Sequence, residues 1–181
     1  MDAALALFAN HGYAPTTVRM IAERAGVATG LLYSHFEGKE ALLRALFERS
    51  MGDVHASFAL ADAADAADPR DRLAALVRGS VQILRANLDF WRVGYAARMQ
   101  PSVLAALGPA LDAWTATILA TLRGYLAELG VRDPDIEARG LFAQIDGMCQ
   151  HFATDPERYP IDAVAERVIA RWGTAVPTER P

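Results

Sequence analysis

The sequence predicts an all-α protein in which a small helical head precedes a larger helical body. Apolar residues recur three and four residues apart along most of the 181-residue chain, which is the period of a helix that buries one face. No stretch alternates apolar and polar residues as a half-buried strand would, and no internal repeat is visible. Glycines follow three of the helical runs, at Gly12, Gly26 and Gly130, where they are suited to end a helix.

The composition is that of a folded soluble protein, with 52% hydrophobic and 22% charged residues. A single cysteine, Cys149, excludes an internal disulfide and a zinc site built from clustered thiolates. A reducing, cytoplasmic location is therefore expected, with no metal or other cofactor. The net charge of −4 argues against generic binding to polyanions, so any contact with nucleic acid has to be local.

The chain is not expected to enter a membrane. Its first residues carry no basic region ahead of an apolar run, which a secretory signal needs. The most apolar stretch, residues 99–122, is interrupted by Pro109 and Asp112 and lacks a charge-free span of about 18 residues.

Four helices are predicted in the first fifty residues. The first covers Ala3 to Phe8 and ends before Gly12, and the second runs from Val18 to Arg24 with a hydroxyl of Thr16 or Thr17 as its cap. The third runs from about Ala28 to His35, and the fourth starts after Gly38 and frays into a loop between residues 60 and 71.

The body is predicted to hold four or five further helices. Four apolar runs with helical spacing mark them: Leu73 to Leu88, Leu111 to Leu129, Ile136 to Phe152 and Ile161 to Trp172. Asp133 and Pro134 are suited to start the third of these.

Residues 17–36 have the pattern of a helix-turn-helix. Two short helices that meet at a steep angle need a small residue between them, a turn residue that tolerates positive φ, and apolar residues inside the angle. Ala22, Gly26, Val27 and Leu32 meet these needs in that order.

The head resembles the DNA-binding domain of the TetR family over Ala4 to Leu46. The residues that carry the resemblance, in order and spacing, are Gly12, Tyr13, Thr16 to Arg19, Ile21 to Val27, Gly30, Leu32, Tyr33, His35, Phe36 and Lys39 to Leu43. The body resembles the family in its helix order. The resemblance implies a helix-turn-helix DNA-binding domain at residues 1–45, followed by a helical effector-binding and dimerisation domain at residues 46–181.

By this resemblance the third helix is a recognition helix, whose first residues meet base edges in the major groove of an operator. The residues at family positions that face DNA are Thr29, Gly30, Tyr33, Ser34 and His35. Thr17, Tyr33 and Lys39 are suited to phosphate contacts. Arg19 is suited to a guanine edge, with phosphate equally open.

The head departs from the family pattern at three places. Ala28 replaces a capping serine, Leu31 replaces a threonine that binds phosphate, and the basic arm and first turn that precede Ala4 in the family are missing. The third departure has two readings, a truncated start or weak binding to DNA. Five basic and five acidic side chains leave the first fifty residues neutral. We therefore expect modest affinity for DNA, with a salt slope shallower than about −6.

A homodimer is expected because recognition helices of this kind work in pairs, on half-sites roughly 34–36 Å apart. The resemblance places the dimer on the last two long helices. The predicted interface residues are Phe142, Ile145, Phe152, Val164, Val168 and Trp172. Gly140 and Gly147 would allow close approach of the helices, and packing of the six within their own chain is the open alternative.

A pocket for a largely apolar small-molecule effector is predicted from aromatic and soft side chains near helix breaks. Its residues are Phe90, Trp91, Tyr95, Met99, Trp114, Gln144, Met148, Cys149 and His151, with Arg92 and Arg98 as further polar groups. Ordinary core packing is the alternative for each of them.

The predicted function is therefore a repressor that a small-molecule effector releases from a palindromic double-stranded operator. An enzyme is disfavoured, because Cys149 and His151 lie two apart on one helix and point to different faces, and His151 with Asp155 offers too few metal ligands. No glycine-rich phosphate loop is present. A helical protein-interaction module that has lost DNA binding is the alternative function.

Overall fold

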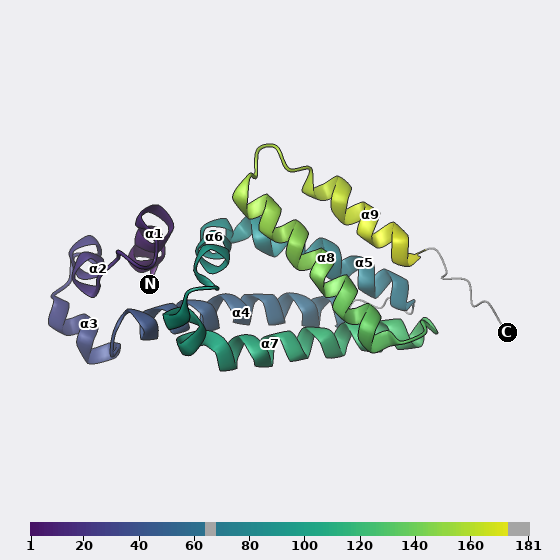
Figure 1. The fold of residues 1–181 in the computed structure, drawn as a ribbon, viewed down its shortest axis with the longest axis horizontal. Helices are drawn as coiled ribbons and strands as arrows, with labels where there is room; N and C mark the ends of the chain where they lie inside the picture. Colours follow the sequence, from purple (N-terminus) through teal and green to yellow (C-terminus); the bar gives the residue numbers. More distant parts are fainter. Residues whose placement is uncertain (64–67, 174–181) are drawn as a thin grey trace. The chain divides into compact units, whose positions relative to one another are not determined.

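The fold is all-α, as predicted. A computed structural model describes residues 1–63 and 68–173, with the backbone alone for residues 53–63 and Ser102. These ranges contain nine helices and no strand (Figure 1). The helices are α1 Asp2–His11, α2 Val18–Ala25, α3 Thr29–His35, α4 Lys39–Ala63, α5 Pro69–Ala86, α6 Leu88–Ala97, α7 Pro101–Glu128, α8 Pro134–Thr154 and α9 Ile161–Gly173.

The helices form two compact units. The first comprises Met1–Gly52 and Asn87–Asp112, and the second comprises Asp53–Ala86 and Ala113–Pro181. The division falls inside α4 and inside α7.

The first unit is built around α1, which packs against α2 and α6, while α2 packs against α3. Its core combines apolar faces of α1, α2, α4, α6 and the start of α7 with Tyr13 of the connecting loop. The buried large side chains include Leu7, Phe8, Tyr13, Ile21, Leu42, Leu43, Leu46, Phe47, Met51, Phe90 and Leu107. The rings of Phe8 and Tyr13 lie 5.1 Å apart. Burial of these side chains holds the helix-turn-helix in place.

Four helix ends have the residues that the sequence predicted for them. The Thr17 hydroxyl accepts a hydrogen bond from the Met20 amide at 3.3 Å, so Thr17 caps α2. Gly12, Gly26 and Gly130 all have positive φ, at 83°, 68° and 72°. A side chain at any of them would be strained, which is why glycine ends these helices.

The second unit packs α5, α8 and α9 against one another. Leu73, Leu76, Val77, Val81 and Leu84 form the buried face of α5. Leu122, Tyr125 and Leu126 add apolar side chains from α7.

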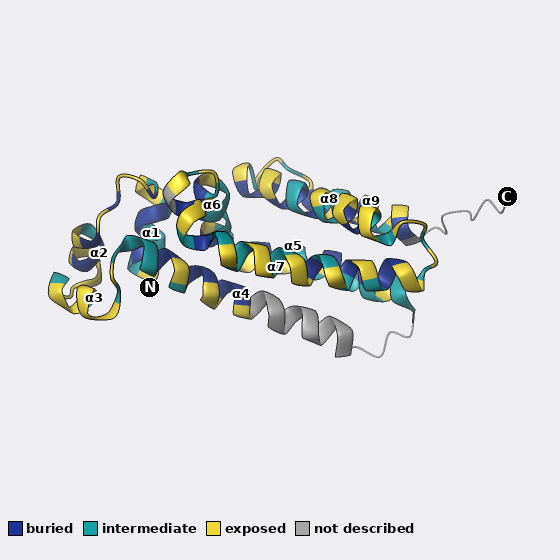
Figure 2. Ribbon diagram, turned by 60° about the horizontal axis from the view of Figure 1, so that its bottom comes forward, coloured by how far each residue is buried: buried dark blue, intermediate teal, exposed yellow. Residues whose placement is uncertain are grey.

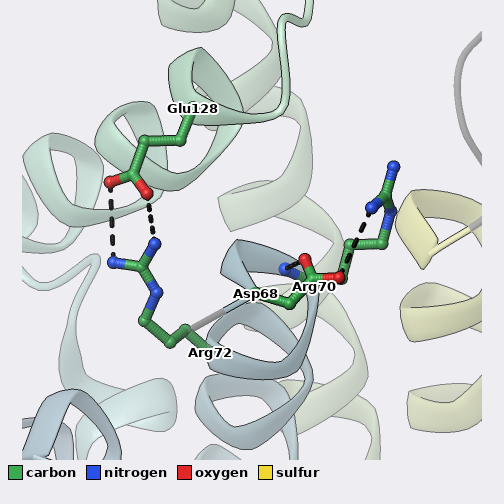
Figure 3. A network of polar contacts seen from close by, with 4 residues as sticks. All are labelled: Asp68, Arg70, Arg72 and Glu128. Atoms are coloured by element: carbon green, nitrogen blue, oxygen red, sulfur yellow. Dashed lines mark hydrogen bonds and ion pairs between the residues drawn. The ribbon is translucent and has the colours of Figure 1, made fainter. Parts of the chain in front are cut away.

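Ion pairs run along the exposed edge between α5 and α9. The Arg78 guanidinium donates to both carboxylate oxygens of Glu166, at 2.8 and 2.9 Å. Arg85 donates to Asp162 at 2.7 Å. Near the start of α5, Arg72 donates to Glu128, and Asp68 pairs with Arg70 (Figure 3). The Arg72 guanidinium also lies 4.9 Å from the centre of the Tyr125 ring.

The body departs from the predicted helices in two places. Leu88 does not extend the α5 run but opens α6, a separate helix for which no individual run was predicted; the chain breaks at Asn87, with φ −130° and ψ 38°. Helix α7 begins at Pro101 instead of near Leu111 and contains Pro109. The ring of Pro109 removes one backbone donor, and Ala105, four residues earlier, is exposed, so water can bond its carbonyl.

Helix α7 also passes a membrane-span test that the sequence prediction did not anticipate. Within the described residues, Val103–Glu128 is long and apolar enough to cross a membrane by length and composition, with a mean hydropathy of 1.5. Only 17% of the 18-residue stretch that has this hydropathy is buried. A single stretch of this kind is weak evidence, because helices of soluble proteins also meet the same criteria.

Candidate nucleic-acid interface

Helix α3 is the most outward-facing helix of the head. None of its residues is buried, and only Thr29 and Leu32 are half-buried (Figure 2). Ala28 stands at its N-cap and makes no side-chain cap bond, as its substitution for serine predicted. A Cβ at Gly30 would meet nothing within 4 Å, so the first turn of α3 is open to an approaching surface.

The five predicted residues of the recognition helix lie together on α3. Gly30, Tyr33, Ser34 and His35 are exposed, and Tyr33 is the most exposed aromatic of the head at 57%. The Ser34 hydroxyl donates to the Leu31 carbonyl at 2.8 Å. Its proton is thus engaged within the helix, and its oxygen is left to accept a bond from a base or water.

Two predicted contact residues lie at the start of α2, Thr17 as its N-cap and Arg19 in its first turn. Thr17 is exposed and caps the helix as an acceptor, so its hydroxyl proton is free of that bond. Arg19 donates from Nε to Glu23 at 2.9 Å, and both side chains are largely exposed, at 81% and 62%. This hydrogen bond raises the pKa of Arg19 further above its usual value. A pair this exposed exchanges readily with water or DNA.

Lys39, which was predicted to contact phosphate, is bound by the loop between α1 and α2. Its ammonium donates to the carbonyls of Tyr13, Ala14 and Thr16, at 3.2, 2.8 and 3.3 Å. An ammonium has three protons, so all three are engaged by the loop between α1 and α2. Lys39 could reach a phosphate only by giving up one of these bonds. The sequence pattern missed this because the partners lie 23 to 26 residues away.

Other arginines of the head are also engaged within the first unit. Arg49 donates to Asp2 at 3.1 Å, and Arg44 donates from Nε to the Ala106 carbonyl at 3.2 Å. Arg24 is exposed at the end of α2. Of the four arginines in the first fifty residues, Arg19 and Arg49 are thus paired with carboxylates, in line with the neutral charge of this segment.

Both parts of the chain match known families. Residues 1–46 match the family described as bacterial regulatory proteins, tetR family, and residues 68–175 match the Tetracyclin repressor-like C-terminal domain. The chain belongs to the TetR family. This TetR-family protein is thus a DNA-binding transcriptional regulator whose head is a helix-turn-helix domain.

Named relatives and solved structures agree with this assignment. The HTH-type transcriptional regulator BetI of Stenotrophomonas maltophilia is 34% identical over 142 residues, which cover 76% of this chain and 70% of BetI. The repressor KstR2 of Rhodococcus jostii is 36% identical over 87 residues, or 48% of this chain and 42% of KstR2. FadR of Bacillus subtilis, solved in complex with stearoyl-CoA, shares the fold with a TM-score of 0.80 at 19% identity, with 97% of each chain covered.

The predicted effector residues of this TetR-family regulator fall into two sets. Phe90, Trp91, Tyr95 and Met99 belong to the first unit. On α6 the Trp91 ring lies 5.5 Å from Phe90 and 5.9 Å from Tyr95, and the Arg98 guanidinium lies 5.0 Å from the centre of the Tyr95 ring. Met99 is 78% exposed. Within this unit the aromatic rings of α6 thus form a continuous row that ends at a cation.

The other predicted effector residues belong to the second unit. Met148 and Cys149 are buried in its core, whereas Gln144 is half-buried. Trp114 packs on Phe142 with ring centres 6.0 Å apart, and the exposed His151 stacks on Tyr159 at 5.7 Å.

Cys149 has the environment of an inert thiol. Burial, together with the charge of Asp146, raises its pKa to about 12. A thiol with this pKa is protonated at neutral pH and is a poor nucleophile. Among the described residues, no three His, Cys, Asp or Glu side chains gather as a metal site.

Most of the predicted dimer residues are buried inside their own chain. Ile145, Phe152, Val168 and Trp172 are each only 7% exposed, and Phe142 and Val164 are half-buried. The four buried side chains pack where α5, α8 and α9 meet and have little surface left for a second copy. The apolar face of α8 and α9 lies where it was predicted, and four of its six side chains are buried in the core.

Proposed function

We propose that this regulator is a repressor that binds a palindromic operator as a homodimer and is released by a small, largely apolar effector. The observation that carries the proposal is α3, a helix with no buried side chain on a head that is otherwise well packed. A helix held by its neighbours, with an open first turn, can enter a major groove without unfolding anything.

For the DNA-binding domain, which we place at residues 1–45, we assign contacts according to side-chain chemistry. Thr29, Tyr33 and His35 would face bases, and Gly30 would let the backbone approach them closely. Thr17 and Arg19 would meet phosphate, with Arg19 exchanging Glu23 for DNA.

For the dimer, we propose the exposed faces of α8 and α9. Small residues recur there: the exposed Gly140 and Ala143 and the half-buried Gly147 lie three and four apart on α8, and the exposed Ala163 and Ala170 lie seven apart on α9. Small side chains allow helices of two copies to approach closely and form a four-helix bundle.

For the effector, we propose a molecule with a long apolar part, and fatty acyl-CoA is the first class to test because FadR was solved with stearoyl-CoA. Such a ligand can release DNA only if it binds better to a dimer whose recognition helices do not fit the operator. Repression of genes also places the protein in the cytoplasm, where bacterial DNA lies.

A protein-interaction module without DNA binding is the second candidate. The engagement of Lys39 by three carbonyls and the neutral head favour it, because both reduce the charge available to phosphate.

A mobility-shift assay with duplex DNA from upstream of the protein's own gene separates the two functions. We expect a shifted complex at submicromolar protein, which stearoyl-CoA dissolves and free CoA does not. Absence of a complex at low salt would refute the DNA-binding proposal and favour the interaction module. A complex that no acyl-CoA affects would overturn the proposed effector class.

A further inference from the structure

Exposed apolar side chains cluster on the helix-turn-helix. In the described part of the chain, the large hydrophobic residues classed as exposed are Met1, Val27, Leu31, Tyr33, Met99, Leu104 and Ile136. Three of these seven lie between residues 27 and 33. Single exposed apolar residues need no explanation, but three within seven residues of a helix-turn-helix indicate that this segment meets a partner. Leu31 and Tyr33 lie two apart on α3 and point to different faces, so Leu31 is considered by itself.

Leu31 is the central member of this cluster. It is 50% exposed, compared with 45% for Leu104 on α7. Its neighbour on the helix, Leu32, is half-buried and supplies the inward contact of α3. The isobutyl group of Leu31 therefore contributes little to the core and faces outward on the proposed DNA surface.

The polar groups next to Leu31 do not compete for the same surface. Gly30 has no side chain and leaves open space above the first turn. The Ser34 hydroxyl turns back to donate to the Leu31 carbonyl at 2.8 Å. Ala28 adds only a methyl group at the start of the helix. The first turn of α3 thus presents an apolar group beside bare backbone.

We propose that Leu31 packs against the C5-methyl group of a thymine in each operator half-site and so determines sequence specificity. The inference rests on the proposed function, in which α3 enters the major groove. There the first residues of a recognition helix meet base edges. The thymine methyl is the one apolar group that the four bases display in that groove.

The other base edges fit this position poorly. Guanine, adenine and cytosine offer hydrogen-bond donors and acceptors, which would lose water against an isobutyl group without gaining a partner. Leu31, which replaces a threonine that binds phosphate in the family, then has a role of its own.

The test starts from selection of bound sequences out of a random duplex library with the full chain. In the selected site each thymine is replaced in turn by deoxyuridine, which removes the C5-methyl group alone. We expect one thymine per half-site whose replacement weakens binding about fourfold, the factor that corresponds to about 0.8 kcal/mol for one buried methyl. Replacement in both half-sites would weaken binding by about the square of that factor.

Two leucine variants control for stability and for general apolar surface. Leu31→Ala should bind DNA but lose the difference between thymine and deoxyuridine. Leu104→Ala makes the same change at a similarly exposed leucine on another helix and should keep the difference. Circular dichroism of both variants should match that of the unchanged protein.

The outcomes distinguish this inference from the function on which it rests. Selection that recovers no bound DNA overturns both. A selected site in which every thymine tolerates deoxyuridine within twofold leaves the DNA-binding function intact and overturns the role of Leu31. Equal sensitivity to deoxyuridine in Leu31→Ala and in the unchanged protein overturns it as well.

Discussion

The ammonium group of Lys39 lies 4.6 Å from the centre of the Tyr13 ring and donates to the carbonyl of the same residue at 3.2 Å. Together with its bonds to Ala14 and Thr16, this contact ties the start of α4 to the loop between α1 and α2. Tyr13 is itself buried at 3% exposure, and burial together with the nearby Glu40 raises its pKa above the usual value. Lys39 thus sets the position of the helix-turn-helix on α4.

Replacing Lys39 with methionine should destabilise the head without changing how DNA binding depends on salt. The variant keeps the apolar stem but loses three charge-assisted bonds, and we expect the free energy of unfolding to fall by about 2 kcal/mol in urea titration. A lysine that touches phosphate would instead reduce the salt slope by about 1 when removed. A reduced slope with unchanged stability would restore the phosphate role predicted from the sequence.

Cys149 should resist alkylation in the folded protein. With its pKa raised to about 12, the thiol is almost entirely protonated at pH 8, and iodoacetamide should label it only in denaturant. Mass spectrometry of protein treated with and without urea measures the labelling. Rapid labelling without urea would show that the thiol is accessible and ionised.

The raised pKa of Cys149 should also make the stability of the protein fall at high pH. A thiol whose folded pKa exceeds its unfolded value keeps its proton longer in the folded state, so stability falls as pH rises from about 9 toward 12. Cys149→Ala removes this contribution. The unchanged protein should therefore lose more stability than the variant over that range, and parallel losses would contradict the burial argument.

The helical frame could be predicted largely from local sequence, whereas its long-range contacts could not. The cap at Thr17 and the turn at Gly26 depend on residues within a few positions, and both were found as predicted. The contact between Arg78 and Glu166 joins residues 88 positions apart, which no local period indicates. The start of α7 was missed because Pro109 interrupts the apolar stretch, and the helix was predicted only from Leu111 onward.

Periodicity also could not identify what the apolar faces contact. Val168 and Ile145 share the spacing expected of either a core or a dimer face, and only the packed structure assigns them to the core. The sequence predicted the helix α3, and it also predicted a phosphate contact for Lys39. The backbone carbonyls that Lys39 binds in the structure cannot be predicted from a pattern of side chains.

The stability that the ion pairs on α9 contribute should be lost in acid. The hydrogen bonds from Arg85 and Arg78 lower the pKa values of Asp162 and Glu166. A carboxyl with a lowered folded pKa stabilises the fold above its unfolded pKa, and this stability is lost as pH falls below the unfolded values of 3.8 and 4.5. The double variant Asp162→Asn, Glu166→Gln should show a smaller loss of stability between pH 5 and 3. Because both carboxyl groups are exposed to solvent, the difference should be small at neutral pH.

The proposed dimer face leads to a test in which core and interface variants behave differently. Ala143 is exposed in the proposed row on α8, and Ala143→Glu should give a folded monomer, because two copies would bring like charges into a close helix contact. Ile145 is buried, and Ile145→Ala should cost about 2–5 kcal/mol of stability yet leave the dimer intact. Sedimentation at micromolar concentration measures the mass of each variant.

Ala116→Glu makes the matched change at an exposed alanine on α7 and should remain dimeric. A dimer that survives Ala143→Glu but dissociates in Ala116→Glu would move the interface to the exposed apolar face of α7. A monomer in the unchanged protein would refute the homodimer. It would also count against an operator with paired half-sites, because such an operator requires two linked recognition helices.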